Sequence, residues 1–243
     1  MPTGASLQVR CLGSFAFRAD GAWQTGPTFK RGRELLQYLA TYSRAAVSRD
    51  TLAEIFWPDL DAEAVRHRLH LAVTGARASL RAAIPALDAI RCAGGSYAWH
   101  PSVRVETDYE AFLACYRDGS IDAQRRGVGL YAGDYCAGER AEWMYALRVR
   151  ASSAFVTMLE RLAEDAAARN DPATALDYGL QLVEADRGHE GATRLVMRAF
   201  AAVGRRGAAL DEYDALHRWL RLHLNVAPSR ATAALREEIA EGG

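Results

Sequence analysis

Residues 47–80 read VSRDTLAEIFWPDLDAEAVRHRLHLAVTGARASL, and this stretch decides the fold of the N-terminal half. A short helix is predicted from Ser48 to Phe56, because a serine is a favourable N-cap and Pro58 disfavours helix at the residue before it. A second, longer helix is predicted to start after Asp61. Two helices joined by so short a turn indicate a helix-turn-helix.

The second helix is amphipathic. Its apolar positions recur at helical period and predict one buried stripe, made of Val65, Leu69, Ala72, Val73, Ala76 and Leu80. At 100° per residue, the opposite face carries His67, His70, Thr74, Ala78 and Arg81, with Arg66, Arg68 and Arg77 on its flanks. Arginine, histidine and threonine on an exposed helix suit base edges and phosphates, so this helix is the predicted recognition helix.

A hairpin is predicted after this helix. Residues 89–92 and 96–99 are predicted as two short strands around Gly94 and Gly95, which can take the positive φ angles of a tight turn. One interpretation is a wing that brings Arg91 and Ser96 to a phosphate backbone. The alternative, of equal weight, is a hairpin that only covers the hydrophobic core.

Upstream, the pattern predicts strands at residues 7–12 and 15–18, a third short strand beginning at Trp23, and a helix from about Arg31 to Tyr42. Three cations, Lys30, Arg31 and Arg33, cluster where this helix begins. Cations there oppose the helix dipole at a typical cost of about 0.3–1 kcal/mol. A DNA phosphate would offset that cost, while the alternative is a solvated helix end.

The charge is unevenly distributed along the chain. The 243 residues carry 30 Lys and Arg against 30 Asp and Glu. Residues 1–104 hold 13 basic and 8 acidic side chains, a net +5, and residues 105–243 a net −5. Binding phosphate needs local positive charge, so the neutral total does not exclude nucleic acid. We expect two domains, 1–104 and 105–243.

Several other classes of protein are disfavoured. There is no long uncharged apolar run and no signal peptide at the N-terminus, so no membrane association and a cytoplasmic location are expected. The four cysteines are far apart, which predicts reduced, buried thiols. No nucleotide-binding loop, nucleophile elbow or paired-carboxylate signature is present, so neither an enzyme nor a cofactor is expected. Glu63, His67 and His70 share a metal-like spacing, but without further ligands we expect no metal.

The C-terminal half contains a repeat. Residues 171–182 (DPATALDYGLQL) align with residues 205–216 (RRGAALDEYDAL) at an offset of 34, the period of tetratricopeptide helix pairs. Two copies fall short of the usual minimum of about three, so the helices of residues 105–160 are expected to complete the stack. The whole pattern from residue 105 onward is helical.

Both halves resemble known families. Residues 30–80 (KRGRELLQYLATYSRAAVSRDTLAEIFWPDLDAEAVRHRLHLAVTGARASL) followed by IRCAGGSYAW resemble the DNA-binding domain of the Streptomyces antibiotic regulatory protein family, whose winged helix is of the response-regulator type. The stretches VETDYEAFLACY, LYAGDYCAG, AEWMYALRVR and LNVAPSRAT resemble the bacterial transcriptional activator domain. The first resemblance implies double-stranded promoter DNA as a partner. The second implies self-association and contact with RNA polymerase or other transcription components.

The sequence departs from the first family where a basic cluster often falls, since Gly75, Ala76 and Ala78 occupy that part of the helix. The function expected is nevertheless a sequence-specific transcriptional activator. The alternative is a tetratricopeptide-like adaptor with a degenerate winged helix. A homodimer is expected through residues 219–224 (WLRLHL), unless Trp219 packs inside the last helix pair.

The predicted fold is an α+β winged helix-turn-helix followed by an all-α tetratricopeptide-like repeat domain. The candidate DNA-binding residues are those on or beside the predicted recognition helix, the first helix and the hairpin: Lys30, Arg31, Arg33, Arg49, Arg66, His67, Arg68, His70, Thr74, Arg77, Arg81, Arg91 and Ser96.

Overall fold

The computed structural model describes residues 5–85 and 88–242. The chain forms two compact units, one of residues up to 114 together with 130–151, the other of residues 115–129 together with 152–243. The expected domain boundary at residue 104 stays a prediction, and residues 105–114 and 130–151 pack with the first unit. In the described parts of the chain, no helix is both long and apolar enough to cross a membrane.

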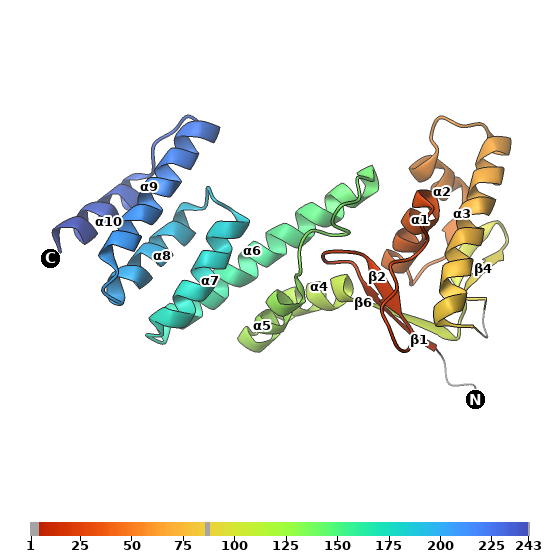
Figure 1. The fold of residues 1–243 in the computed structure, drawn as a ribbon, viewed down its shortest axis with the longest axis horizontal. Helices are drawn as coiled ribbons and strands as arrows, with labels where there is room; N and C mark the ends of the chain where they lie inside the picture. The colour runs from red at the N-terminus through yellow and green to blue at the C-terminus, as the bar shows by residue number, and fades with distance from the viewer. Residues whose placement is uncertain (1–4, 86–87, 243) are drawn as a thin grey trace. The chain divides into compact units, whose positions relative to one another are not determined.

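A three-stranded sheet lies in the first unit, in the order β2-β1-β6 (Figure 1). Strand β1 (Ala5–Arg10) pairs antiparallel with β2 (Ala16–Arg18) and parallel with β6 (Val103–Thr107). The third strand expected at Trp23 is wrong: Gln24 forms only an isolated bridge with Phe17. Trp23 instead lies under the guanidinium groups of Arg10 and Arg18, at 3.9 and 4.5 Å from its ring centroid.

Strand β6 corrects the expectation that the chain is helical from residue 105 onward. Residues 103–107 alternate in burial, with Val103 and Thr107 buried and Arg104 exposed. This alternation suits an edge strand, and pairing with β1 satisfies its backbone groups. The helical pattern begins only at Asp108.

Three helices and a hairpin follow the first two strands. Helix α1 (Lys30–Thr41) packs beside α3 (Ala62–Ala83), and α2 (Arg49–Phe56) precedes α3 (Figure 1). Strands β4 (Ile90–Ala93) and β5 (Ser96–Trp99) form the predicted hairpin, and β5 also pairs with β3 (Val47–Ser48). The indole of Trp99 donates a hydrogen bond to the carbonyl oxygen of Leu39 at 2.7 Å, which fastens the hairpin to α1.

Residues 130–151 complete the first unit. They follow α4 (Asp108–Asp118) and α5 (Ile121–Leu130) and include the short 3₁₀ helix η1 (Glu142–Met144). The amide of Cys136 donates to the carbonyl of Cys11 at 2.6 Å, and the fully buried Tyr135 hydroxyl contacts that of Thr41. Arg148 donates to three carbonyl oxygens of this segment, which holds its loop against the first turns of the helix that starts at Tyr145.

The second unit is a helical stack. Helices α6 (Tyr145–Ala168), α7 (Pro172–Ala185), α8 (Glu190–Ala202), α9 (Arg206–His223) and α10 (Arg230–Glu241) follow one another, with α6 starting in the first unit. Helices α7 and α9 begin 34 residues apart, as the repeat predicts. Helix α10 closes the stack, since Leu235 and Ile239 pack with Val196 and Phe200. These buried contacts confirm that the C-terminal half is a tetratricopeptide-like helical domain.

The four cysteines are free thiols. Cys11 and Cys136 are buried as expected, but Cys92 is exposed on β4 and Cys115 is partly exposed, so burial was wrongly expected for these two. The β4 position explains Cys92, because three of the four residues of this strand face solvent.

Helices α7 and α8 approach each other closely at Gly179. A Cβ atom there would lie 2.8 Å from Val196 Cγ2 and 2.9 Å from Leu195 Cδ2. At Gly75 in α3, by contrast, a Cβ would meet nothing within 4 Å. The same substitution is therefore expected to act in opposite directions at the two positions.

Gly179→Ala should lower the free energy of unfolding by about 1–2 kcal/mol, because overpacking outweighs the gain in helix propensity. Gly75→Ala should raise it by about 0.5–1 kcal/mol, because only the propensity changes. Urea unfolding of both variants followed by circular dichroism measures the difference. Equal signs for the two variants would contradict the close approach of α7 and α8.

A partly buried carboxylate joins the residues directly after β1 to the start of α4. Asp108 Oδ1 accepts a hydrogen bond from the amide of Cys11 at 2.6 Å, and Oδ2 accepts one from Leu12 at 3.2 Å. Burial raises the pKa of Asp108 from 3.8 to about 6, although these hydrogen bonds lower it. The folded state therefore retains a proton that the unfolded state releases. The contribution of Asp108 to stability is present below about pH 4 and is lost as the pH rises through about 6.

Asp108→Asn removes this titration but keeps an oxygen that accepts from the Cys11 amide. Between about pH 4 and pH 7, wild-type stability should fall relative to the variant by roughly 3 kcal/mol, the equivalent of the pKa shift. Denaturant unfolding of both proteins across this pH range gives the difference. A difference that does not vary with pH would show that the carboxyl group titrates normally.

Candidate nucleic-acid interface

Side-chain caps fix the starts of α2 and α3. The hydroxyl of Ser48 accepts a hydrogen bond from the amide of Thr51 at 3.0 Å, and α2 ends at Phe56, with Trp57 as its C-cap directly before Pro58. The carboxylate of Asp61 accepts from the next helix's first amides at 3.0 and 2.9 Å. Capping groups of this kind stabilise a helix by about 1 kcal/mol each. Both helix starts predicted from the sequence are confirmed.

One face of α3 is buried as predicted. Its buried residues are those of the predicted apolar stripe: Val65, Leu69, Ala72, Val73, Ala76 and Leu80. Against this face lies α1, where a Cβ at Gly32 would come within 3.3 Å of the Ala72 carbonyl oxygen. The core therefore fixes the rotation of α3 and determines which side chains reach solvent.

The opposite face of α3 is polar, exposed and unengaged. Within residues 5–85 and 88–242, none of its exposed polar candidates makes a hydrogen bond or ion pair: Arg66, His67, Arg68, His70, Thr74 and Arg81. Leu71 is also 47% exposed on this helix and was missed by the sequence analysis. Leucine is usually buried, and the next residue, Ala72, is buried. The sequence could have shown Leu71 to be exposed only through its angular position on the helix, outside the buried stripe.

Arg77 differs from the other arginines of α3. Its guanidinium donates two hydrogen bonds to the carbonyl oxygen of Ile90, at 3.0 and 2.7 Å, and pairs with Asp88 at 3.1 Å. The side chain is only 27% exposed. Arg77 thus fastens the hairpin to α3, a structural role that the sequence did not reveal.

The cations at the start of α1 also have internal partners. Lys30 and Arg31 pair with Glu34, at 3.8 and 2.6 Å, although Glu34 itself is almost fully buried. Arg33 pairs with Glu139 at 2.6 Å and donates to the carbonyl of Pro27. The anions that offset the charge at this helix end are therefore carboxylates of the chain itself. Lys30 remains 61% exposed.

The small sheet brings the remaining candidates together. The amide of Arg49 donates to the carbonyl oxygen of Gly95 at the hairpin turn, at 2.9 Å, and Ser96 pairs with Ser48. Arg49 and Arg66 line one depression of about 420 Å³ between α2 and α3, together with Asp50 and Glu54. Arg91 is exposed on β4. Arg49 and Arg66 thus lie between α2 and α3, whereas Arg91 lies on the hairpin.

Tyr97 on the hairpin has a perturbed pKa. Burial raises the pKa of Tyr97, with the nearby Cys92 adding to the shift and Arg49 and Arg77 opposing it. The phenol therefore stays protonated at neutral pH and can donate a hydrogen bond. Among the described residues, no group of three His, Cys, Asp or Glu side chains is placed to hold a metal ion. This includes Glu63, His67 and His70.

Comparisons with known proteins bear on both units. The family model described as the bacterial transcriptional activator domain matches residues 104–240, more than half of the chain. The chain belongs to this family. This family is a domain of transcriptional activators, so the part of the chain that it covers belongs to transcription regulation rather than to catalysis. No significant match was found among curated proteins.

Solved structures show a related fold. A structure of Mycobacterium tuberculosis EmbR in complex with a low-affinity phosphopeptide matches with a TM-score of 0.71 at 19% sequence identity. The match covers 97% of this chain and 65% of EmbR, so the chain spans about two thirds of that protein's length. A Plasmodium falciparum FK506-binding protein domain with TPR motifs matches with a TM-score of only 0.41, at 10% identity over 56% of this chain and 89% of that chain, a likeness too weak to bear on the fold.

The family match confirms the resemblance predicted for the C-terminal half of this activator-domain protein. The resemblance of its N-terminal half to a winged-helix DNA-binding domain stays a prediction, which the observed α2, α3 and hairpin support.

Proposed function

We propose that this activator-domain protein binds double-stranded promoter DNA through a winged helix-turn-helix formed by α2, α3 and the β4–β5 hairpin. The observation that supports this proposal best is the division of α3 into one fully buried face and one exposed face of unengaged arginine, histidine and threonine side chains. A helix presented in this way fits the major groove. RNA polymerase or another transcription component is the partner proposed for the helical unit.

The candidate residues take different roles in this proposal. Arg66, Arg68 and Arg81 would contact phosphates, and His70 and Thr74 would face base edges near the middle of the helix. Arg91 on the hairpin and Arg49 beside its turn would reach the flanking backbone. The contacts that Lys30, Arg31, Arg33 and Arg77 make within the protein give these residues at most a secondary part.

Replacing Arg66 and Arg68 together with alanine should weaken binding to the DNA upstream of the protein's own gene. Each lost phosphate contact should lower the slope of log affinity against log salt by about 0.9, so the pair should lower it by about 1.8. Fluorescence anisotropy at several salt concentrations measures both quantities. The urea midpoint should not change, because both side chains are exposed and unengaged.

Arg104→Ala is the matched control, because Arg104 lies on β6, is 81% exposed and pairs with Glu106 on the same strand. It should leave the DNA affinity and the salt slope unchanged. If the slope of log affinity against log salt does not change in the Arg66/Arg68 variant, these arginines of α3 do not contact DNA. In that case the helical unit alone would carry the activator function.

We also propose that the protein forms a homodimer through the end of α9. Trp219 itself is partly buried, because its ring stacks on His223 of the same helix and lies against Gly188 between α7 and α8. Beyond it, Leu222 and Leu224 are 81% and 58% exposed, and Val226 extends the apolar surface. Leu235 and Ile239 of α10 pack against α8 and α9, whereas this apolar strip at the end of α9 stays exposed.

Replacing Leu222 and Leu224 together with glutamate should convert the dimer into a monomer, because charge at an apolar contact opposes association. Sedimentation velocity of the wild type and the variant, free and bound to DNA, measures the state. Val203→Glu is the control, since Val203 is 45% exposed at the end of α8, near the start of α9 rather than its end. A wild type that is monomeric both free and on DNA would contradict the dimer.

A further inference from the structure

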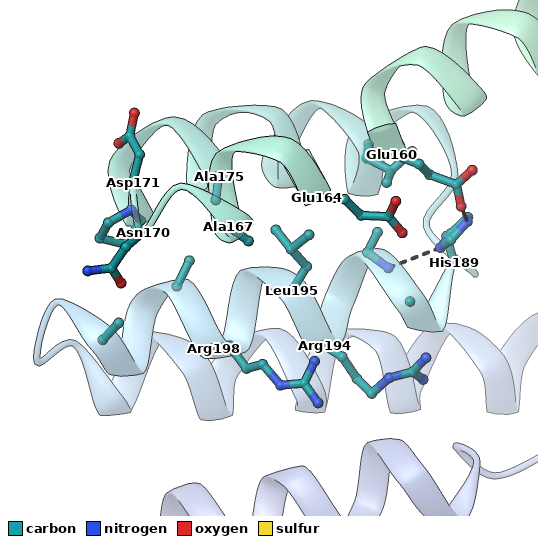
Figure 2. A pocket seen from close by; sticks show the side chains of 16 residues that line it. Glu160, Glu164, Ala167, Asn170, Asp171, Ala175, His189, Arg194, Leu195 and Arg198 are labelled. Atoms are coloured by element: carbon teal, nitrogen blue, oxygen red, sulfur yellow. Dashed lines mark hydrogen bonds and ion pairs between the residues drawn. The ribbon is translucent and has the colours of Figure 1, made fainter. Parts of the chain in front are cut away.

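A pocket of about 510 Å³ opens between α6, α7 and α8 in the second unit (Figure 2). Apolar side chains form much of its lining, among them Ala175, Leu182 and Leu195. Charged side chains from α6 and α8 also line it. A pocket of this volume, with an apolar lining and a few charged groups, is typical of sites for small molecules.

The charges follow the repeat. Glu160 and Glu164 on α6 and Arg194 and Arg198 on α8 line the pocket, and each glutamate is separated from one arginine by the repeat length of 34 residues. Equivalent positions of stacked repeats lie on the same face. The first repeat therefore presents acidic groups and the second presents basic groups on one side of the stack. Figure 2 shows Leu195 between Glu164 and the two arginines.

Two of these four groups are already engaged. Glu160 accepts from His189 Nε2 at 2.7 Å, while His189 Nδ1 caps α8 through the amide of Ala192. Arg194 donates to the hydroxyl of Thr232 at 2.9 Å.

The other two, Glu164 and Arg198, are exposed. Across the described parts of the chain, neither has a hydrogen bond or an ion pair. The pocket is thus bordered by one unengaged carboxylate and one unengaged guanidinium.

We propose that this pocket binds a small zwitterionic ligand, with its cationic group at Glu164, its anionic group at Arg198 and an apolar middle over Leu195. Packed helices lie about 8–10 Å apart, so the two charges of the ligand should be separated by roughly 7–10 Å. An extended peptide spans at most about 3.3–3.6 Å per residue, and a tripeptide with free ends therefore has the right reach. The activator domain would carry an effector site that does not depend on the DNA interface.

The test uses the tripeptide Ala-Leu-Ala in three forms: with free ends, with an acetylated amino end, and with an amidated carboxyl end. The three share one apolar body and differ only in charge. Isothermal titration calorimetry of the full chain should show the free form binding roughly 10-fold more tightly than either blocked form. That factor corresponds to one hydrogen-bonded charge at each end.

Two variants assign the ends. Arg198→Ala should weaken binding of the free form roughly 10-fold, to the level of the amidated form, and leave the amidated form unchanged. Glu164→Gln should do the same for the free form relative to the acetylated form. Arg221→Ala is the control, since Arg221 is an exposed arginine of α9 outside the pocket.

Filling the pocket locates the site. Ala167 and Ala168 are both exposed at the end of α6, but only Ala167 lines the pocket. Ala167→Trp should abolish binding of the free tripeptide, and Ala168→Trp should leave it unchanged. Equal affinity of the three forms for the wild type, no saturable binding of the free form, or equal effects of the two tryptophan variants would each overturn the proposal.

Discussion

The parallel pairing of β1 with β6 is the constraint on which the first unit depends. It joins residues 5–9 to residues 103–107 and so closes a loop that contains α1, α2, α3 and the hairpin. Closing so long a loop costs chain entropy, which contacts across it must offset. Asp108 continues the connection by accepting hydrogen bonds from the amides of Cys11 and Leu12, directly after the strand ends.

A later segment of the chain also contacts the residues that follow β1. Residues 130–151 bond to Cys11 and Gly13 through backbone groups, and their buried Tyr135 contacts α1. The chain directly after β1 is therefore covered by this loop, and the backbone groups of Cys11 and Gly13 find hydrogen-bond partners there. The family match and the compact unit overlap here, because the region that the activator-domain model describes also completes the N-terminal core.

Local signals predicted the three helices and the hairpin of the first unit, and long-range pairing was beyond them. The caps at Ser48 and Asp61, the stripe from Val65 to Leu80 and the Gly94-Gly95 turn each depend on neighbouring residues, and each formed as expected. Strand β6 is only five residues long and its partner lies about a hundred residues away, so its alternation alone could not place it in a sheet. The same holds for the candidate site: the sequence indicated which arginines are on α3, but not that Arg77 binds Ile90.

The net charge of the chain is zero, yet α3 and the pocket of the helical stack each present charged side chains. This is possible because folding places acidic and basic side chains on different surfaces. On α3 the apolar stripe leaves arginine and histidine on the opposite face, and few acidic groups of that helix neutralise them. At the start of α1, by contrast, Glu34 and Glu139 are placed against the cations, which removes those cations from the free surface. In the helical stack the repeat places acidic groups of α6 opposite basic groups of α8 without joining Glu164 to Arg198. What distinguishes a structural charge from an available one is therefore the partner that the fold supplies, and only charges without a partner can bind DNA or a ligand at little desolvation cost.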